Sequence, residues 1–286
     1  MKVIITDPIS ESGISFLKEA DFSVVQLYNA SKEDIIRACE DADGWIIRSG
    51  TKIDKKMIKA AKKLKAIGRA GVGVDNIDID EATKRGIIVM NTPDVNTISA
   101  AEHSIAMMLA LSRNVSIGDS EVKQMKWNRH LLIGSELRAK TLGLVGMGKI
   151  GREVMSRCIS FGMNVLGYDP FVNKEMFKDG EIEIVDLDRL TEQSDFISIH
   201  VPLNSDTTNL FDYKRLKKMK QTARIINVSR GGIINEKDLS RALRDGVISG
   251  AAIDVFTKEP IEKSNPLIDS PNILLTPHLG ASTKEA

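Results

Sequence analysis

The sequence around Gly146 constrains the fold more than any other part of this chain of 286 residues. An apolar segment that begins at Thr141 runs into the spacing Gly146-x-Gly148-x-x-Gly151, and a helical pattern follows. Strand, glycine turn and helix in this order are typical of a βαβ unit that binds a dinucleotide. We expect Gly146 to make the tight turn, Gly148 to let the backbone approach the pyrophosphate, and Gly151 to pack helix against strand. The start of the helix would offer its N–H groups to the phosphates.

A carboxylate follows at the position that selects the cofactor. The apolar run 164–168 ends in Asp169, which lies where such units place the acid that binds the adenosine ribose. A carboxylate there accepts hydrogen bonds from the ribose hydroxyls and repels a 2′-phosphate. Pro170 and Phe171 supply no cation that would neutralise that phosphate. The sequence therefore predicts NAD rather than NADP.

Short apolar runs alternate with amphipathic segments along the whole chain, which predicts an α/β fold with parallel sheets covered by helices. In the first part we expect helices at 12–19 and 32–40, and strands at 3–6, 23–27, 44–48, 66–67 and 87–90. In the second part we expect strands at 142–145, 164–168, 196–200, 224–228, 248–252 and 273–275. Between the two parts, residues 97–126 predict one long helix or two abutting helices.

The composition excludes several classes of protein. Hydrophobic residues make up 42% and charged residues 28%, as in ordinary globular proteins, and the length predicts two domains. Forty basic and 39 acidic side chains give a net charge of +1, so no nucleic-acid or membrane partner is expected. The lysine-rich segment 52–65 has Met57, Ile58, Ala61 and Leu64 at helical spacing, which predicts a solvated helix face rather than a polyanion site.

The cysteines and the N-terminal residues indicate in which cellular compartment the protein is expected. Cys39 and Cys158 lie far apart, so neither a disulfide framework nor a cysteine zinc site is predicted, and no other cluster has metal-ligand spacing. Residues 1–10 predict a strand and a loop rather than a signal peptide. We therefore expect a cytoplasmic protein without a metal site.

Several further motifs accompany the glycine fingerprint. They are GRAGVGVDN at 68–76, NTPDVN at 91–96, AEH at 101–103, INVSRGG at 226–232, AIDVFTKEP at 252–260 and TPHLGAS at 276–282. In this order they resemble the D-isomer-specific 2-hydroxyacid dehydrogenases over essentially the whole chain. The resemblance implies two doubly wound parallel-sheet domains, Rossmann-like and flavodoxin-like, with an active-site cleft between them. Residues 1–94 would bind substrate and 95–280 NAD, and 281–286 would begin a helix that returns to the first domain.

The resemblance also implies a catalytic trio of Arg230, Glu259 and His278. The guanidinium of Arg230 would hold the substrate carboxylate in a bidentate pair. His278 would take the hydroxyl proton as hydride leaves, and Glu259 would bind the other imidazole nitrogen and fix its tautomer. The other three histidines have weaker claims. His200 ends a strand, and the family contacts the cofactor there through the backbone of the next residue, Val201. His103 is expected to be a packing and hydrogen-bonding residue and His130 a surface residue.

Further contacts are implied by the same resemblance. Those to the cofactor would be Val72, Gly146, Gly148, Lys149, Ile150, Gly151, Asp169, Val201, Val228, Ser229, Arg230, Asp254, His278, Leu279, Gly280 and Ala281. Those to the substrate would be Arg48, Ser49, Arg69 and Asn96, with Arg129 reached from a partner subunit.

The extra cations decide between substrates. The resemblance implies D-3-phosphoglycerate as the substrate, which would be oxidised to 3-phosphohydroxypyruvate in serine biosynthesis, and Arg48 and Arg69 favour it because it carries a phosphate. A reductase of glyoxylate, hydroxypyruvate or D-lactate has no use for them and is the alternative. A more remote alternative is an NAD-sensing corepressor. The apolar content of 97–126 also predicts a homodimer.

Overall fold

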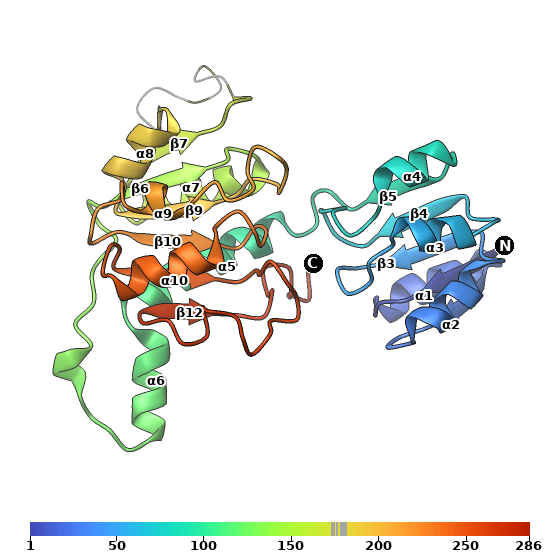
Figure 1. Cartoon of the computed structure of the whole chain (residues 1–286), viewed down its shortest axis with the longest axis horizontal. Coiled ribbons are helices and arrows are strands. Elements are labelled where there is room, and N and C mark those ends of the chain that lie inside the picture. Colours follow the sequence, from blue (N-terminus) through green and yellow to red (C-terminus); the bar gives the residue numbers. More distant parts are fainter. Residues whose placement is uncertain (173–174, 176, 178–181) are drawn as a thin grey trace. The chain divides into compact units, whose positions relative to one another are not determined.

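The computed structural model describes residues 1–172, 175, 177 and 182–286. The chain divides into two compact units, Met1–Asn96 and Thr97–Ala286, where the sequence suggested 1–94 and 95–280. Each unit is built on a parallel β-sheet (Figure 1). The predicted α/β fold with two parallel-sheet domains is therefore confirmed.

Unit 1 alternates strands with helices from its first residues. In chain order they are β1 (Lys2–Ile5), α1 (Glu11–Glu19), β2 (Ser23–Gln26), α2 (Lys32–Cys39), β3 (Gly44–Ile47), α3 (Lys55–Ala60), β4 (Ala66–Arg69), α4 (Ile79–Lys84) and β5 (Ile88–Asn91). The strand order is β2-β1-β3-β4-β5, all parallel, which is the flavodoxin-like order. In such a sheet ligands bind at the carboxyl ends of the strands near β1 and β3.

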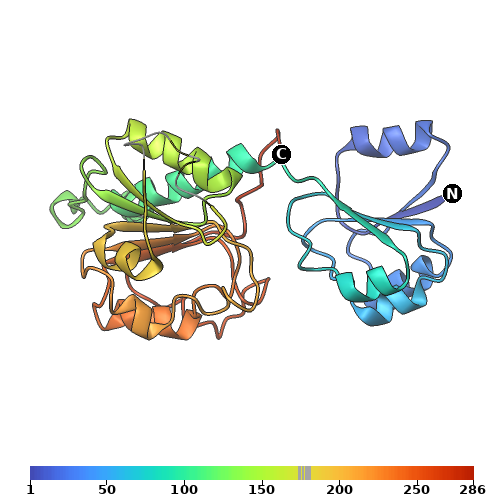
Figure 2. The same ribbon diagram turned by 90° about the horizontal axis from the view of Figure 1, so that it is seen from above.

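The apolar residues of unit 1 divide between the two faces of this sheet. Ile14 of α1 packs on Val3 and Ile5, and the helices α2, α3 and α4 pack on the other face around Trp45 (Figure 2). The apolar residues of the lysine-rich segment 52–65 are buried in the cluster around Trp45, whereas the seven lysines of the segment are exposed. The prediction of a solvated helix face is confirmed.

Unit 2 begins with two helices and continues as an α/β series. Its elements are α5 (Thr97–Ser112), α6 (Val115–Lys123), a short 3-10 helix (Arg129–Leu131), β6 (Thr141–Val145), α7 (Lys149–Ser160), β7 (Asn164–Tyr168), β8 (Glu183–Ile184), α8 (Leu187–Gln193), β9 (Phe196–Ile199), α9 (Tyr213–Leu216), β10 (Arg224–Asn227), α10 (Glu236–Arg244), β11 (Gly250–Ile253) and β12 (Ile273–Leu275). Among the described residues, the strand order is β12-β11-β10-β9-β6-β7-β8, all parallel. The sequence order of the strands reverses between β6 and β9, as in a Rossmann sheet.

The helices of unit 2 cover both faces of its sheet (Figure 2). Met107 and Met108 of α5 pack with Val154 and Cys158 of α7 on one face. The other face buries residues of α8, α9 and α10 around Phe211. The loops that follow β6, β7, β9, β10, β11 and β12 lie at the carboxyl edge of the sheet.

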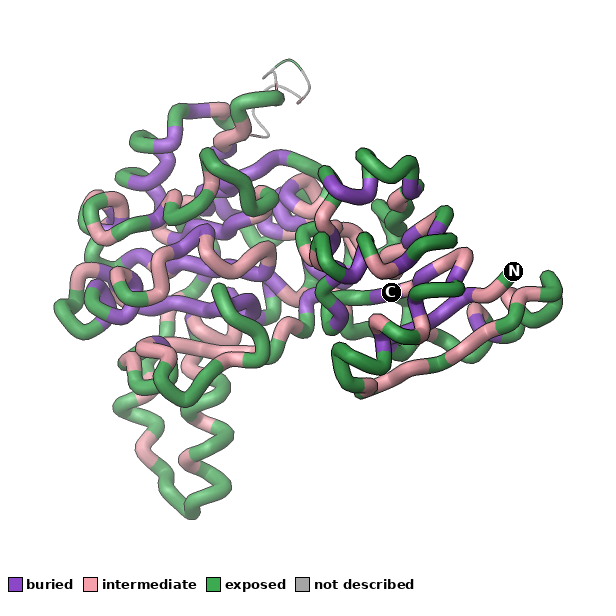
Figure 3. The backbone as a smooth tube through the Cα atoms, turned by 45° about the vertical axis from the view of Figure 1, so that its right-hand side comes forward, coloured by how far each residue is buried: buried purple, intermediate pink, exposed green. Residues whose placement is uncertain are grey.

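The helical segment 97–126 forms two helices. Asn114 lies in the left-handed region at φ 54°, so the chain turns there between α5 and α6. No residue of α6, which is described throughout, is buried. Residues 113–135 form an arm that extends from the rest of unit 2 (Figure 1), coloured largely as exposed in Figure 3.

Three details differ from the sequence expectation. Strand β8 was not predicted, and β11 begins at Gly250 rather than at 248. Residues 281–286 form turns and bends rather than the start of a helix. A helical turn of so few residues gains too few hydrogen bonds to offset the cost of nucleation. No helix of the described residues is long and apolar enough to cross a membrane.

Candidate active site

Close contacts shape the turn after β6 at two of its three glycines. Gly146 has a φ of 101°, and a Cβ there would lie 2.6 Å from the carbonyl oxygen of His200. A Cβ at Gly151 would lie 2.2 Å from the carbonyl oxygen of Gly146. Larger residues at either position would push the start of α7 away from the ends of β6 and β9. The two glycines therefore build the turn where the strand order reverses.

Gly148 differs, because its own surroundings in the protein do not require a glycine. Its φ of −68° and ψ of −165° suit any residue, and no described atom beyond its chain neighbours lies within 4 Å of an added Cβ. It is the N-cap of α7, whose first N–H groups have no partners within the helix. Open space at such a helix start fits a phosphate group.

Asp169 at the end of β7 is tied to this turn. One carboxylate oxygen accepts a hydrogen bond from the Met147 N–H at 2.9 Å, and the other accepts one from the Phe171 N–H at 2.9 Å. β6 and β7 are paired in parallel, so the turn and the carboxylate lie at the same edge of the sheet. The arrangement fits an adenosine ribose beside the pyrophosphate position.

His200 follows β9 beside the same turn. Its Nε2 lies 2.9 Å from Ser198 Oγ, and burial lowers the pKa of His200 to about 4. The imidazole is therefore neutral near pH 7. Its backbone N–H donates to the Val145 carbonyl at 2.7 Å, directly before the glycine turn, and Val201, which was predicted to contact the cofactor, follows it.

The loop after β10 presents Arg230. Asn227, buried at the end of the strand, accepts hydrogen bonds from the N–H and hydroxyl of Ser229 and donates one to the Arg230 carbonyl. A Cβ at Gly231 would lie 2.0 Å from the Phe256 carbonyl, so only glycine permits this approach. The contact brings the Arg230 loop against the segment that leads to Glu259.

Glu259 and His278 form a pair. His278 Nδ1 lies 2.7 Å from Glu259 Oε2, and Glu259 Oε1 accepts a hydrogen bond from the Phe256 N–H at 2.9 Å. Burial raises the pKa of Glu259, but the hydrogen bonds from His278 and Phe256 outweigh it and hold the pKa below its ordinary value. The ionised carboxylate can only accept, so we assign the proton to Nδ1 of His278. Nε2 is then left with a lone pair.

The loop that carries His278 is anchored on Asp254, a fully buried residue directly after β11. The carboxylate of Asp254 accepts hydrogen bonds from the Leu279 N–H at 2.7 Å and the Gly280 N–H at 2.9 Å. Its backbone carbonyl accepts the His278 N–H at 2.8 Å. Asp254 therefore holds three consecutive residues of the loop.

The structure thus gathers most of the predicted residues of unit 2 at the carboxyl edge of its sheet. Lys149 and Ile150 begin α7, Val228 and Ser229 follow β10, and Ala281 follows the loop after β12. Arg129 instead lies on the exposed arm, in the 3-10 helix.

The predicted residues of unit 1 lie at the carboxyl ends of its own strands. Arg48 and Ser49 follow β3, and Arg69 ends the adjacent β4. The guanidinium of Arg69 lies over Gly71, where a Cβ would be 1.5 Å from Nη1. Val72 follows in the same loop, and Asn96 is the last residue of the unit.

Asp7 and Asn76, which were not predicted from the sequence, hold the Arg48 loop in place. Asp7 accepts hydrogen bonds from the backbone N–H groups of Arg48 at 2.7 Å and Thr51 at 3.0 Å. Asn76 donates to the carbonyls of Arg48 at 2.7 Å and Thr51 at 2.6 Å. The available signal was position, since Asp7 follows β1, and β1 and β3 are neighbours at the switch point of the sheet.

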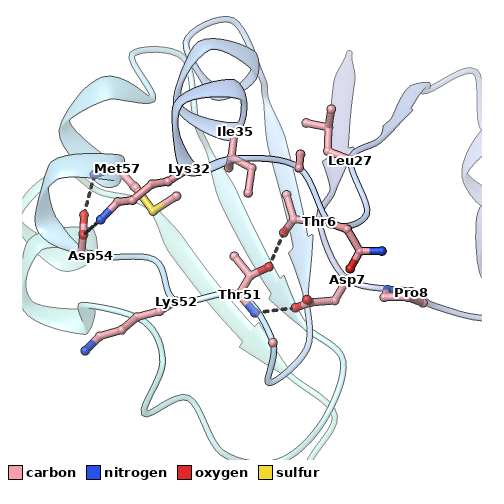
Figure 4. A pocket seen from close by; sticks show the side chains of 13 residues that line it. Thr6, Asp7, Pro8, Leu27, Lys32, Ile35, Thr51, Lys52, Asp54 and Met57 are labelled. Atoms are coloured by element: carbon pink, nitrogen blue, oxygen red, sulfur yellow. Dashed lines mark hydrogen bonds and ion pairs between the residues drawn. The ribbon is translucent and has the colours of Figure 1, made fainter. Parts of the chain in front are cut away.

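A hollow of about 380 Å³ lies behind that loop, between the ends of β1 and β2 and the starts of α2 and α3 (Figure 4). Its polar side chains bind one another: Thr51 Oγ1 donates to Thr6 Oγ1 at 2.9 Å, and Lys32 pairs with Asp54 at 2.7 Å. These contacts stabilise the loop, and we assign no part of the reaction to this hollow.

Residues 105–280 match the family model described as the D-isomer specific 2-hydroxyacid dehydrogenase NAD binding domain. The chain belongs to this family and contains its NAD-binding domain. Gly148, the start of α7 and Asp169 are the features that fit NAD.

The chain is similar over its whole length to several proteins of this family. The chain is 46% identical to a D-3-phosphoglycerate dehydrogenase of Archaeoglobus fulgidus, a match that covers 100% of this chain and 54% of that protein. It is 48% identical to one of Synechocystis, over 100% of this chain and 51% of that protein. The chain thus spans about half the length of these relatives. A structure of an NAD-dependent formate dehydrogenase from Staphylococcus aureus in complex with NAD matches with a TM-score of 0.90 at 30% identity, over 99% of this chain and 90% of that one.

Gly148 provides a test of the cofactor site that does not depend on the substrate. Gly148→Ala should weaken NAD binding by about 10-fold or more, because the added methyl group occupies the space through which the backbone approaches the pyrophosphate. The melting temperature should stay or rise slightly, because the backbone angles suit alanine. Calorimetric titration with NAD and a melting curve measure both.

The control is Gly13→Ala in α1, where an added Cβ makes only ordinary contacts at 3.5 Å. It should leave NAD binding unchanged. Equal NAD affinity in Gly148→Ala and wild type would contradict the assigned role of Gly148.

Proposed function

We propose that this chain carries out the NAD-dependent oxidation of D-3-phosphoglycerate to 3-phosphohydroxypyruvate, the first step of serine biosynthesis. The observation that carries the chemistry is the 2.7 Å pair between His278 Nδ1 and Glu259 Oε2, at the carboxyl edge of the sheet that also carries the NAD-binding turn. The relatives named D-3-phosphoglycerate dehydrogenase support the substrate. The buried thiols of Cys39 and Cys158 are free, which agrees with a cytoplasmic location.

NAD supplies the acceptor for the hydride that leaves C2 of the hydroxy acid. The hydroxyl proton passes to Nε2 of His278 as the C2–O bond becomes a carbonyl. Glu259 stabilises the imidazolium that forms, because its carboxylate faces Nδ1–H. In the reverse direction the same imidazolium returns the proton to the carbonyl oxygen.

The cationic side chains would orient the substrate. We assign to Arg230 the substrate carboxylate, since a guanidinium fork matches a carboxylate in a bidentate pair. We assign the phosphate to Arg48 and Arg69, with Arg129 added from a partner subunit. We also propose that Ser49 and Asn96 form hydrogen bonds with the substrate.

A panel of acids tests the proposal against its alternatives. Steady-state rates with NAD or NADH should show the highest kcat/KM for D-3-phosphoglycerate and 3-phosphohydroxypyruvate. A preference for glyoxylate, hydroxypyruvate or D-lactate would replace the proposed substrate. Absence of turnover with every acid, despite NAD binding, would favour an NAD-sensing binding protein.

We also propose a homodimer, supported by the apolar surface of the arm. The side chains of Val115, Met125, Trp127, Leu131 and Ile133 are all more than half exposed, and Met125 reaches 94%. An apolar surface of this kind on a separate arm marks an interaction site, and a second copy of the chain is the occupant we propose.

Sedimentation equilibrium should give the dimer mass, and the variant Met125→Ser/Trp127→Ser should shift the mass toward the monomer. The matched control is Phe171→Ser, since Phe171 is 92% exposed but lies outside the arm. A monomer mass for wild type at every protein concentration would contradict the dimer.

A further inference from the structure

His103 lies behind the catalytic loop, on α5. Its Nε2 is 3.2 Å from Asp254 Oδ1 and 3.3 Å from Thr276 Oγ1, and 19% of its side chain is exposed. Thr276 Oγ1 in turn donates to the same Asp254 oxygen at 2.5 Å. Two side chains from different elements thus converge on one buried carboxylate.

That carboxylate controls the backbone around His278. His278 has a φ of 54°, in the left-handed region, where the Cβ of an L-residue lies too close to the following carbonyl oxygen. Asp254 holds this conformation, because it accepts the N–H groups of His278, Leu279 and Gly280. A buried carboxylate with fewer donors would be less stable in this position.

The hydrogen bonds also keep Asp254 ionised. Burial raises the pKa of its carboxyl, but the hydrogen bonds from His103, Thr276, Leu279 and Gly280 outweigh burial and leave the pKa below its ordinary value. His103 is therefore one of four donors on which the charge of Asp254 depends.

We propose that His103 is a positioning residue that acts on His278 through Asp254. By donating Nε2–H to Asp254 Oδ1, His103 fixes the carboxylate that accepts the Leu279 and Gly280 N–H groups, directly after His278, and so keeps the His278 ring against Glu259. This role rests on the proposed function for its effect on turnover, but the ring position itself can be measured without substrate.

The experiment compares His103→Ala, His103→Gln, which retains an N–H donor, and the matched control Ser104→Ala. Ser104 is the next residue on α5 and is buried, but its hydroxyl donates to the Ala100 carbonyl at 2.8 Å. The first readout is the ¹⁵N spectrum of His278, whose tautomer reports the hydrogen bond between Nδ1–H and Glu259. Assignment is practical, since the chain has four histidines. The second readout is kcat/KM.

In wild type and Ser104→Ala, neutral His278 should be the Nδ1–H tautomer. In His103→Ala its nitrogen signals should move toward a mixture of tautomers, and kcat/KM should fall by about 10-fold to 100-fold, the loss expected for a hydrogen bond to a charged group. His103→Gln should have nitrogen signals for His278 and a kcat/KM close to those of wild type.

Three results would overturn the proposal. They are unchanged nitrogen signals in a folded His103→Ala, lower kcat/KM without any change in those signals, or a His103→Gln that behaves like His103→Ala. If wild type oxidises no hydroxy acid, the proposed function fails while the nitrogen signals still decide the role of His103.

Discussion

Replacing His278 with alanine should lower turnover by roughly 100-fold to 10,000-fold, the usual contribution of a general acid–base residue. The reason is that Nε2 of His278 would be the acceptor of the hydroxyl proton, and alanine leaves water in its place. NAD binding should be largely kept, because the features that fit the cofactor lie at the turn after β6 and at Asp169. Stopped-flow or steady-state rates and an NAD titration measure the two effects.

Glu259→Gln is the graded comparison for His278→Ala. The carboxamide oxygen can still accept Nδ1–H, but it carries no charge to stabilise the imidazolium. We therefore expect a smaller loss than in His278→Ala and a change in the pH dependence of turnover. Near-normal turnover in His278→Ala would refute its catalytic assignment.

Arg48→Ala should raise KM for D-3-phosphoglycerate by roughly 30-fold to 4,000-fold, which corresponds to the 2–5 kcal/mol lost when one member of a desolvated charge pair is removed. KM for NAD should barely change. Weak activity on unphosphorylated 2-hydroxy acids should also stay nearly constant, because those substrates have no group that pairs with the guanidinium.

Lys52→Ala is the matched control, since it removes an exposed cation only four residues further along the chain. It should leave both substrate classes unaffected. If Arg48→Ala reduces the rates with both classes equally, Arg48 has a structural role in the loop that Asp7 and Asn76 brace, and the phosphate assignment fails.

The parts of the fold that were predictable are those in which local pattern and burial agree. Residues 142–145 before Gly146 form a continuous apolar run, and the strand before Arg230 has Ile225 and Ile226 at its centre, as expected for strands covered on both faces. The glycines were predictable because their roles depend on backbone geometry, and the structure shows two of them in contacts that a Cβ would prevent.

Other features depend on contacts between distant residues. The link from His103 to Asp254 joins residues 151 positions apart, and the pair of Asp7 with the Arg48 loop joins residues 41 positions apart. Neither contact leaves a periodic pattern in the sequence. β8 is only two residues long, too short for an alternation of side chains to show. The sequence also did not decide between one long helix and two helices at 97–126. The left-handed backbone at Asn114 separates the two helices, and this conformation leaves no pattern in the sequence.

The most direct test of hydride transfer uses D-3-phosphoglycerate that carries deuterium at C2. This chain is incubated with the labelled acid and NAD, and the NADH that forms is analysed by mass spectrometry. We expect NADH to carry one deuterium when the D isomer is used and none when the L isomer is used. Unlabelled NADH from the D isomer, or equal labelling from both isomers, would contradict it.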